Sequence, residues 1–317
     1  MINFRFHLVS LIAVFLALAL GVVMGATVID EAIVDGLNSR INSVEREADS
    51  QRAQNNDLRD ELERSDAYVN GTAAFTVSGK LEGVPVVVAA LRGADGDNVQ
   101  NAVLRLQEAG AQVQGVLWLE ERWLLSDEDA RQQLADALGV QPEPGTERAA
   151  AWAALAQRLA AGTAPEAGDV LTPLTDAGFV SFEPVGDGEE DADAFPPEYP
   201  GSGARVLLIG GTDGTPEAEA MMELLAPAAR AFVAADLPVV AGEAFRPEDD
   251  GPGQGARLAA VRGDDGLAAA VSTVDDLELV EGTVAAVLAV ADLEQNVVGH
   301  YGRGDGASGP IPAPPSR

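Results

Sequence analysis

A long apolar run lies near the beginning of the chain. From Leu8 to Ile29 no charged residue occurs, and Ser10 and Thr27 are the only polar ones. A helix of this length extends about 33 Å at 1.5 Å per residue, which is enough to cross a hydrocarbon core of about 30 Å. The pattern therefore predicts a transmembrane helix, with residues 1–29 as a membrane anchor.

The charges on either side of this span indicate its orientation. Arg5 and the terminal amine precede it, whereas Asp30, Glu31 and Asp35 follow it. By the positive-inside tendency, we expect the N-terminus to be cytoplasmic and the rest of the chain to lie outside, at the cell membrane or cell envelope. A cleaved signal peptide is the alternative, although its apolar region would run only about 7–15 residues.

Small residues recur at every fourth position of the span: Ala13, Ala17, Gly21 and Gly25. They share one ridge of a helix, and small residues there let a second helix approach closely. We expect this ridge to be a helix-dimer face. The alternative is that the ridge reflects only the high alanine and glycine content of the chain.

Residues 30–70 continue with apolar residues every three or four positions, and neither Gly nor Pro interrupts the stretch from Leu37 to Asn70. This spacing predicts a coiled-coil stalk that forms a parallel homodimer, with a lone polar helix as the alternative. Its middle is weak, because Ala48, Gln51 and Asn55 bury little apolar surface. An Asn in the core typically fixes two strands in register. The expected core residues are Val34, Leu37, Ile41, Val44, Asn55, Leu58 and Leu62.

From residue 71 onward, short apolar runs alternate with amphipathic segments, which is typical of an α/β fold with a mainly parallel sheet. The first half, 71–184, is predicted to contain strands at 84–91, 112–119 and 178–183 and helices at about 98–109, 127–138 and 146–161. The acidic, Pro- and Gly-rich residues 185–203 predict a solvated linker or long loop.

The pattern then restarts over residues 204–300. It predicts strands at 204–209, 237–242 and 269–273, a helix at 216–235, and a helix or strand at 283–293. Both halves contain a strand, a G(A/T)DG turn, a helix and a second strand, which suggests an internal duplication. Residues 301–317 are rich in Gly and Pro and predict a flexible tail.

Composition restricts the function further. The 317 residues carry 20 basic and 51 acidic side chains, giving a net charge of −31, and Lys80 is the only lysine. Such an acidic chain repels nucleic acid, so we expect no nucleic-acid partner. The absence of cysteine excludes disulfides, thiolate metal sites and cysteine nucleophiles, and two histidines leave little room for imidazole chemistry.

Candidate chemistry is sparse, and none of the common hydrolase, zinc-protease or phosphate-loop motifs occurs. Asp95 and Asp213 lie in the two G(A/T)DG turns, where open α/β sheets bind ligands, and could share a cleft as an acid–base pair or cation site. Asp beside Gly is also an ordinary solution for a tight turn. His300 is either a surface ligand or a hydrogen-bonded turn residue. These three are weak metal candidates, and we assign no catalytic or cofactor-binding residue.

Three strings carry a family resemblance: HLVSLIAVFLALALGVVMG at 7–25, VSTVDD at 271–276 and GHYG at 299–302. Together with the predicted coiled coil, they resemble the actinobacterial MctB family, whose members are labelled copper-transport outer-membrane proteins. The likeness runs from the first residues to about Pro312. It implies an envelope protein of copper transport, efflux or homeostasis, with copper as the metal concerned and the outer membrane as its labelled place.

The residues by themselves favour a second function. An anchor, a dimeric stalk and no catalytic set are the parts of a non-catalytic envelope scaffold that recruits or regulates a cell-wall or division enzyme. We therefore expect a non-enzyme with a possible envelope protein partner. A hydrolase using Asp95 or Asp213 is a third hypothesis.

Overall fold

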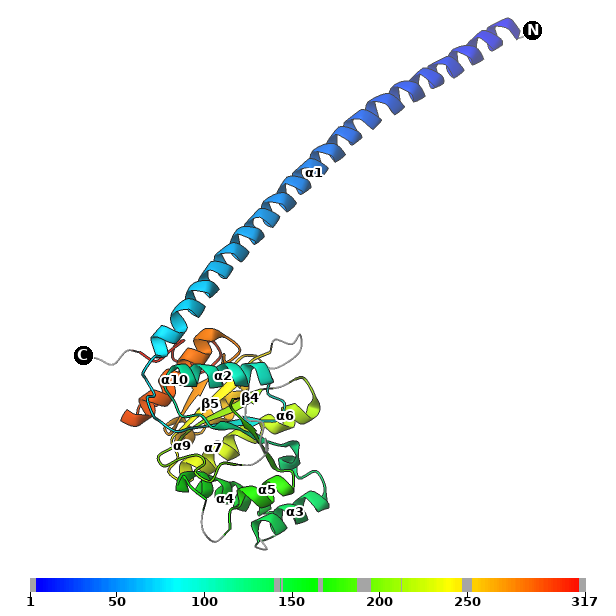
Figure 1. Ribbon diagram of the computed structural model, residues 1–317. Helices are drawn as coiled ribbons and strands as arrows, with labels where there is room; N and C mark the ends of the chain where they lie inside the picture. The colour runs from blue at the N-terminus through cyan, green and yellow to red at the C-terminus, as the bar shows by residue number, and fades with distance from the viewer. Residues whose placement is uncertain are drawn as a thin grey trace. The chain divides into compact units, whose positions relative to one another are not determined.

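The computed structural model describes residues 4–139, 143, 145–164, 168–186, 195–211, 213–246 and 253–313, and the side chains of residues 26–34 lie outside this description (Figure 1). The chain divides into two compact units, Met1–Ala67 and Tyr68–Arg317. Each unit is described in turn.

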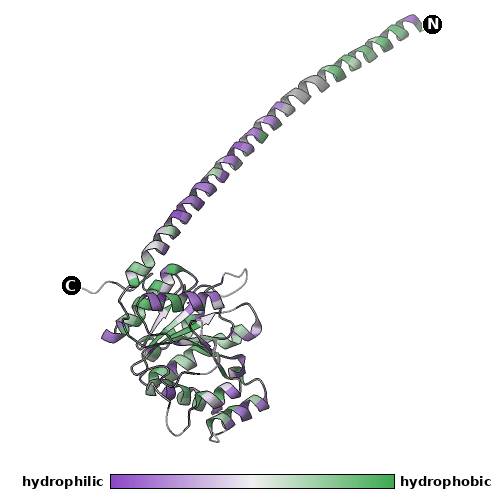
Figure 2. Cartoon of the chain, viewed as in Figure 1, coloured by the Kyte–Doolittle hydropathy of each residue, from purple (hydrophilic) through white to green (hydrophobic). Residues whose placement is uncertain are grey.

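Helix α1 runs from Phe4 to Val77, and its residues up to Ala67 form the first unit, whereas its last turns belong to the second. Within it, Phe4–Gly25 is long and apolar enough to cross a membrane by length and composition, and none of it is buried. Figure 2 shows the change from apolar side chains in this stretch to mostly polar ones in the stalk. The apolar helix candidate predicted at the N-terminus is present, and it begins at Phe4, before Leu8.

The small-residue ridge of the span faces open space in the single chain. Ala13, Ala17 and Gly21 are exposed, and a Cβ atom built on Gly21 or Gly25 would meet nothing within 4 Å. The helix-dimer face stays a prediction.

The expected stalk core is likewise uncovered. Five of its residues are 52–64% exposed: Leu37, Ile41, Val44, Leu58 and Leu62. Asn55 is exposed and its Nδ2 donates to the Gln51 carbonyl at 3.1 Å, while the Val34 side chain lies outside the described residues. The stalk is thus a helix whose predicted seam points into solvent, and the coiled coil stays a prediction.

The second unit is built on one seven-stranded sheet in the order β3-β2-β1-β4-β5-β6-β7. Its strands are β1 (Val86–Leu91), β2 (Gly115–Leu119), β3 (Val180–Pro184), β4 (Arg205–Gly211), β5 (Val239–Ala244), β6 (Val271–Val274) and β7 (His300–Tyr301). All neighbouring pairs are parallel except β2–β3. The mainly parallel sheet is confirmed, and the two predicted halves contribute to the same sheet because β1 pairs with β4.

Helices cover both faces of this sheet (Figure 1). One face packs against α3 (Glu128–Leu138), α4 (Glu147–Ala161), α5 (Leu171–Asp176), α6 (Pro216–Met222), α7 (Leu225–Ala234), α8 (Ala259–Arg262) and α9 (Asp265–Ala268). The other packs against α2 (Gly96–Glu108), α10 (Val280–Asp292) and the end of α1, where Ala73 and Val77 are buried. Alternate strand residues point to the two faces, so Val87 and Ala89 lie in one core and Val86 and Val88 in the other. Short 3-10 helices occupy Glu121–Leu124, Ala256–Leu258 and Leu293–Gln295.

The predicted helix over 216–235 is wrong as a single element, since α6 ends at Met222 and α7 starts at Leu225. Pro227 explains the break. Because proline has no N–H, a continuous helix would leave the Glu223 carbonyl without its donor, and the ring would crowd the preceding turn.

Part of the predicted linker is core instead. Tyr199 is buried, and its ring lies 5.2 Å from those of Phe182 and Phe195, centroid to centroid. The Tyr199 carbonyl also accepts a hydrogen bond from Arg158 at 2.8 Å. Aromatic burial thus outweighs the polar composition of 195–203, whereas residues 187–194 lie outside the described residues.

Candidate functional site

The two G(A/T)DG turns meet at the centre of the sheet. Strands β1 and β4 are parallel neighbours, and β1 has β2 on its other side, so the strand order reverses between them. A Cβ on Gly93 would clash with Ala218, and one on Gly211 would lie 3.2 Å from the Cα of Ala94. These glycines allow the turns to pack together at the point where open α/β sheets bind ligands.

Asp95 and Asp213 line one cavity there, of about 440 Å³, together with Arg92, Asn98, Phe245 and Arg246. The structure therefore brings together the two acidic residues singled out from the sequence. What their carboxylates do is set by their hydrogen bonds.

Both carboxylates accept hydrogen bonds from within their own turns. Asp95 Oδ1 accepts from the backbone N–H groups of Asp97 and Asn98, at 2.9 and 3.3 Å, and caps α2. Asp213 Oδ1 accepts from the hydroxyl and the N–H of Thr215, at 2.6 and 3.0 Å. These bonds hold the pKa of Asp213 below its ordinary value. A general acid needs a raised pKa, so Asp213 is unsuited to donate a proton at neutral pH.

We expect Asp95→Ala to lower the free energy of unfolding of the second unit by about 1 kcal/mol, because the first N–H groups of α2 lose their acceptor. Asp95→Asn, whose amide oxygen keeps the cap, should cost only a few tenths. Thermal unfolding of the full chain in detergent, followed by tryptophan fluorescence, compares the two. Equal losses would show that the charge, and not the cap, is what matters.

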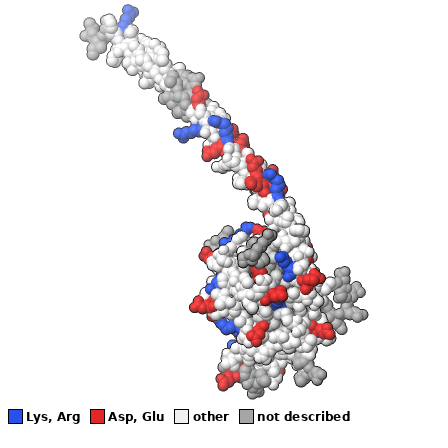
Figure 3. Space-filling model, turned by 90° about the vertical axis from the view of Figure 1, so that its left-hand side faces the viewer, with Lys and Arg blue, Asp and Glu red and all other residues white. Residues whose placement is uncertain are grey.

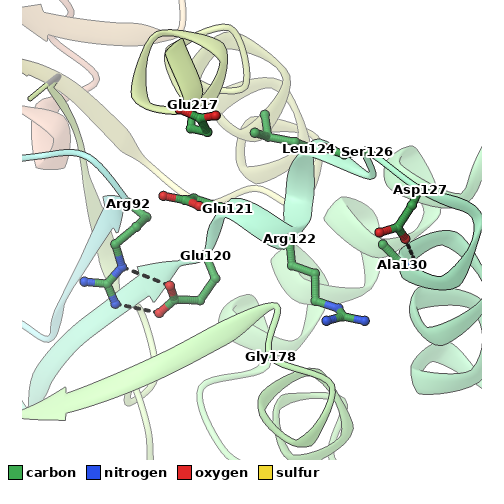
Figure 4. Close-up of a pocket in the computed structure, with 10 residues that line it drawn as sticks. All are labelled: Arg92, Glu120, Glu121, Arg122, Leu124, Ser126, Asp127, Ala130, Gly178 and Glu217. Carbon is green, nitrogen blue, oxygen red and sulfur yellow. Dashed lines mark hydrogen bonds and ion pairs between the residues drawn. The ribbon is translucent and has the colours of Figure 1, made fainter. Parts of the chain in front are cut away.

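A second cavity, of about 590 Å³, shares Arg92 with the first (Figure 4). Arg92 binds Glu120 through two hydrogen bonds, Nε to Oε2 at 2.9 Å and Nη2 to Oε1 at 2.6 Å. Ser181 donates to the same carboxylate at 2.6 Å, and the Arg92 guanidinium lies 4.4 Å from the Trp118 ring centroid. Burial would raise the pKa of Glu120, but the bonds from Arg92 and Ser181 outweigh it and lower the pKa.

The sequence interpretation missed this Arg92–Glu120 pair. Its signal was a charged residue directly after each of two buried strands, since Arg92 follows β1 and Glu120 follows β2. Figure 4 shows Glu121 and Glu217 above this pair and Arg122 to its right. The lining holds four carboxylates and two guanidinium groups, so its field disfavours anionic ligands.

A buried polar cluster lies where the VSTVDD and GHYG strings meet. Strands β6 and β7 pair with Thr273 opposite His300 and Val274 opposite Tyr301. Asp275 directly follows β6 and has no exposed surface. Asp275 Oδ1 accepts hydrogen bonds from the N–H groups of Arg303 and Gly304 at 2.8 and 3.0 Å. Asp275 Oδ2 accepts one from Arg262 Nη2 at 2.8 Å.

Two predictions change at this cluster. His300 lies in strand β7 and not in a turn, with Nδ1 3.0 Å from the Thr273 hydroxyl, and its role as a metal ligand stays a prediction. Burial, assisted by the charge of Arg262, lowers its pKa. The predicted flexible tail is also ordered through residues 302–309, because Asp275 binds its backbone and Gly309 pairs with Tyr301. Residues 314–317 lie outside the described residues.

Asp276 and Glu243 are buried beside this cluster and have no exposed surface. Among the described residues, neither oxygen of Asp276 has a hydrogen-bond partner, and Arg303 Nε is 4.0 Å from its Oδ2. Burial, together with the charges of Asp275 and Glu278, raises the pKa of Asp276 to about 7. Burial also raises the pKa of Glu243 to about 7, although Arg257 at 3.3 Å opposes the shift.

The described residues contain no group of three or more His, Cys, Asp or Glu side chains arranged to hold a metal ion. The weak metal candidates are accordingly dispersed. Asp95 and Asp213 line the central cavity, whereas His300 lies in β7 at the edge of the sheet.

These features define a class: an α/β unit with a mainly parallel sheet, preceded by a helix that carries one candidate membrane span. The chain belongs to the MctB family, described as copper transport outer membrane protein, whose profile matches residues 1–312. It is similar to the copper transporter MctB of Mycobacterium tuberculosis (strain ATCC 25618 / H37Rv), with 27% identity over 97% of this chain and 98% of the relative. The copper transporter MctB of Mycobacterium leprae (strain TN) is 26% identical with the same coverage. The resemblance noted from the sequence is thus confirmed.

Proposed function

We propose that this chain serves copper transport or copper homeostasis at the cell envelope. The observation that carries the proposal is the family match over residues 1–312, with relatives named copper transporters that align over nearly their whole length. Copper is the cargo in this proposal and not a resident cofactor.

We further propose a single-pass topology, with the N-terminus in the cytoplasm and the second unit outside. The apolar stretch Phe4–Gly25 and the charges around it support this topology. The family description names the outer membrane. Fractionation of cells that express the full chain, followed by protease treatment of intact and lysed preparations, tests both points. A second unit that resists protease until the inner membrane is opened would contradict the topology.

How the chain would act on copper follows from what its residues offer. Copper(I) prefers thiolate, thioether and imidazole ligands, yet the sequence has no cysteine, two histidines and four methionines. The chain is therefore poorly equipped to pass copper along its own side chains. We propose that it acts as a non-catalytic component of an assembly, and that any conduit would need several copies or other envelope proteins.

Deletion of the gene is expected to raise sensitivity to copper salts and to increase cell-associated copper, and the intact chain should restore both. A chain with Asp95→Asn and Asp213→Asn should restore them equally, because both residues act as turn caps. Growth on graded copper and metal content by mass spectrometry measure the outcome. Unchanged copper tolerance would contradict the proposal, and failure of the double variant alone would favour carboxylate chemistry at the central cavity.

The exposed apolar seam of the stalk favours a second candidate function, a non-catalytic dimeric scaffold that recruits or regulates a cell-wall or division enzyme. Five large apolar side chains of the stalk lie in solvent in the single chain. A cell-separation defect with normal copper tolerance in the deletion strain would support this candidate over copper transport.

A further inference from the structure

The stalk exposes an apolar seam, interrupted in its middle by polar residues, that lacks a covering partner within the described first unit. Leu37, Ile41, Val44, Leu58 and Leu62 are each more than half exposed. They follow the alternating three- and four-residue spacing of a heptad repeat, which confines them to a narrow stripe. A stripe this narrow matches the seam of another helix better than a broad globular surface.

The polar residues in the middle of the seam indicate which kind of partner the stalk binds. Gln51 and Asn55 stand at seam positions and are exposed. A lipid surface would leave these amides without partners, whereas a second copy aligned in register places Asn55 opposite its own equivalent, where two amides can bond. The polar layer therefore favours another stalk over a membrane.

The flanking charges point the same way. Beside the seam, one flank carries Arg40, Glu47, Gln54 and Glu61, and the other carries Glu45, Arg52, Arg59 and Asp66. In a parallel, in-register pair, each residue of the first flank faces the second-flank residue five positions later in the other chain. Arg40 then meets Glu45, and Glu47 meets Arg52.

These residues are available for such contacts. Arg40, Glu45 and Glu47 are exposed, and Figure 3 shows basic and acidic side chains side by side along the stalk. Among the described residues, Arg52 pairs with Asp49, at 3.0 Å, with both side chains at least 74% exposed. An ion pair so exposed contributes little, so Arg52 can be shared with Glu47 of a second copy at small cost.

The last flanking pair is different, because Glu61 would face Asp66 of the other copy. Like charges at this layer weaken the pairing at the end of the stalk that leads to the second unit. The charges thus concentrate the attraction in residues 40–52.

An antiparallel pair is the strongest competitor. With Ile41 set against Leu58, it brings Arg40 to Glu61 and Glu45 to Arg52, which are also favourable. It sets Asn55 against Val44, however, and it puts the apolar spans of the two chains at opposite ends of the stalk. Chains inserted in the same membrane cannot meet that condition.

We infer that the stalk binds a second copy of this chain as a parallel, in-register two-stranded coiled coil, in which Arg40–Glu45 and Glu47–Arg52 contacts between the chains select the partner. The inference is independent of copper, so it can fail while the copper proposal holds, and the reverse.

Because the chain has no cysteine, single introduced cysteines report the pairing directly. In a parallel pair, Val44→Cys and Leu58→Cys should each give a disulfide-linked dimer of the full chain in detergent under mild oxidation. Ala53→Cys, on the opposite side of the helix, is the matched control and should give little. Failure of both seam variants to exceed this control would overturn the inference, as would crosslinking that requires Val44→Cys and Asn55→Cys together, which indicates the antiparallel pair.

A charge exchange tests the proposed contacts separately. Glu47→Arg places two like-charged contacts in the dimer and should raise its dissociation constant roughly tenfold at low salt. Adding Arg52→Glu should restore it, because the opposite charges are re-formed with their order reversed. In the antiparallel pair, the double variant would instead set two acids together at positions 45 and 52. A double variant that dimerises no better than Glu47→Arg would therefore refute the assigned contacts.

Discussion

Asp275→Ala is expected to lower the free energy of unfolding of the second unit by about 3–5 kcal/mol. Asp275 has no exposed surface, and it is the carboxylate that pairs with Arg262, whose side chain is only 6% exposed. Its removal leaves a guanidinium buried without its counter-charge and deprives the N–H groups of Arg303 and Gly304 of their acceptor. Residues 302–309 should detach first, because Asp275 holds that segment to β6.

The change can be followed by tryptophan fluorescence of the full chain during unfolding in detergent, since Trp118, Trp123 and Trp152 all lie in the second unit. Arg131→Ala is the control, because it breaks an exposed ion pair with Glu128 and should cost less than about 0.5 kcal/mol. If Asp275→Ala costs no more than this control, the buried cluster is not what holds the segment.

The adjacent residue should respond in the opposite direction. Asp276→Asn is expected to stabilise the second unit by about 2–4 kcal/mol above pH 7 and by close to nothing near pH 4. Burial raises the pKa of Asp276 to about 7 in the folded chain, whereas an unfolded aspartate titrates near 4. The folded chain therefore holds this proton more tightly, and ionisation opposes folding increasingly as the pH rises from about 4 to 7, with a constant cost above that range. Asparagine cannot ionise and avoids this cost.

Unfolding curves at several pH values between 4 and 8 provide the measurement, with the unmutated chain beside the variant. Asp176→Asn, at an exposed position at the end of α5, should show no comparable change with pH. A stabilisation by Asp276→Asn that is equal at pH 4 and pH 8 would mean that packing, and not ionisation, is responsible.

The contrast between Asp275 and Asp276 shows what the sequence can and cannot tell. Two neighbouring carboxylates after a strand point to opposite sides of the sheet, so alternation alone separates their surroundings. Nothing local shows, however, that Asp275 finds Arg262 thirteen residues earlier while Asp276 finds no donor among the described residues. Which partner a buried carboxylate meets depends on how the chain returns between strands, and the spacing of apolar residues in the sequence does not indicate that path.

The helices and strands themselves were easier to predict from the sequence. Runs such as 86–91 and 206–211 are buried on both faces and carry no charged residue, which made their prediction as parallel strands straightforward. Strand β7 was missed because it has two residues and is held by its register with β6. In the same way, Asp95 and Asp213 could be placed at the central cavity from their turns, whereas the Arg92–Glu120 pair joins residues 28 apart and became visible only in the folded chain.

The short strand β7 also affects how readily neighbouring copies of the chain could aggregate through their sheet edges. An open sheet edge offers unpaired backbone groups onto which another chain can add a strand, and long, flat edges are sites of aggregation. Here that edge is only His300–Tyr301, and Gly309 of the same chain already pairs with Tyr301. At the other edge, β3 runs antiparallel and ends in Pro184, which lacks an N–H to donate. In the part of the chain that the structure describes, these features make both sheet edges poorer sites for another chain to add a strand, which matters where many copies are held close together on one surface.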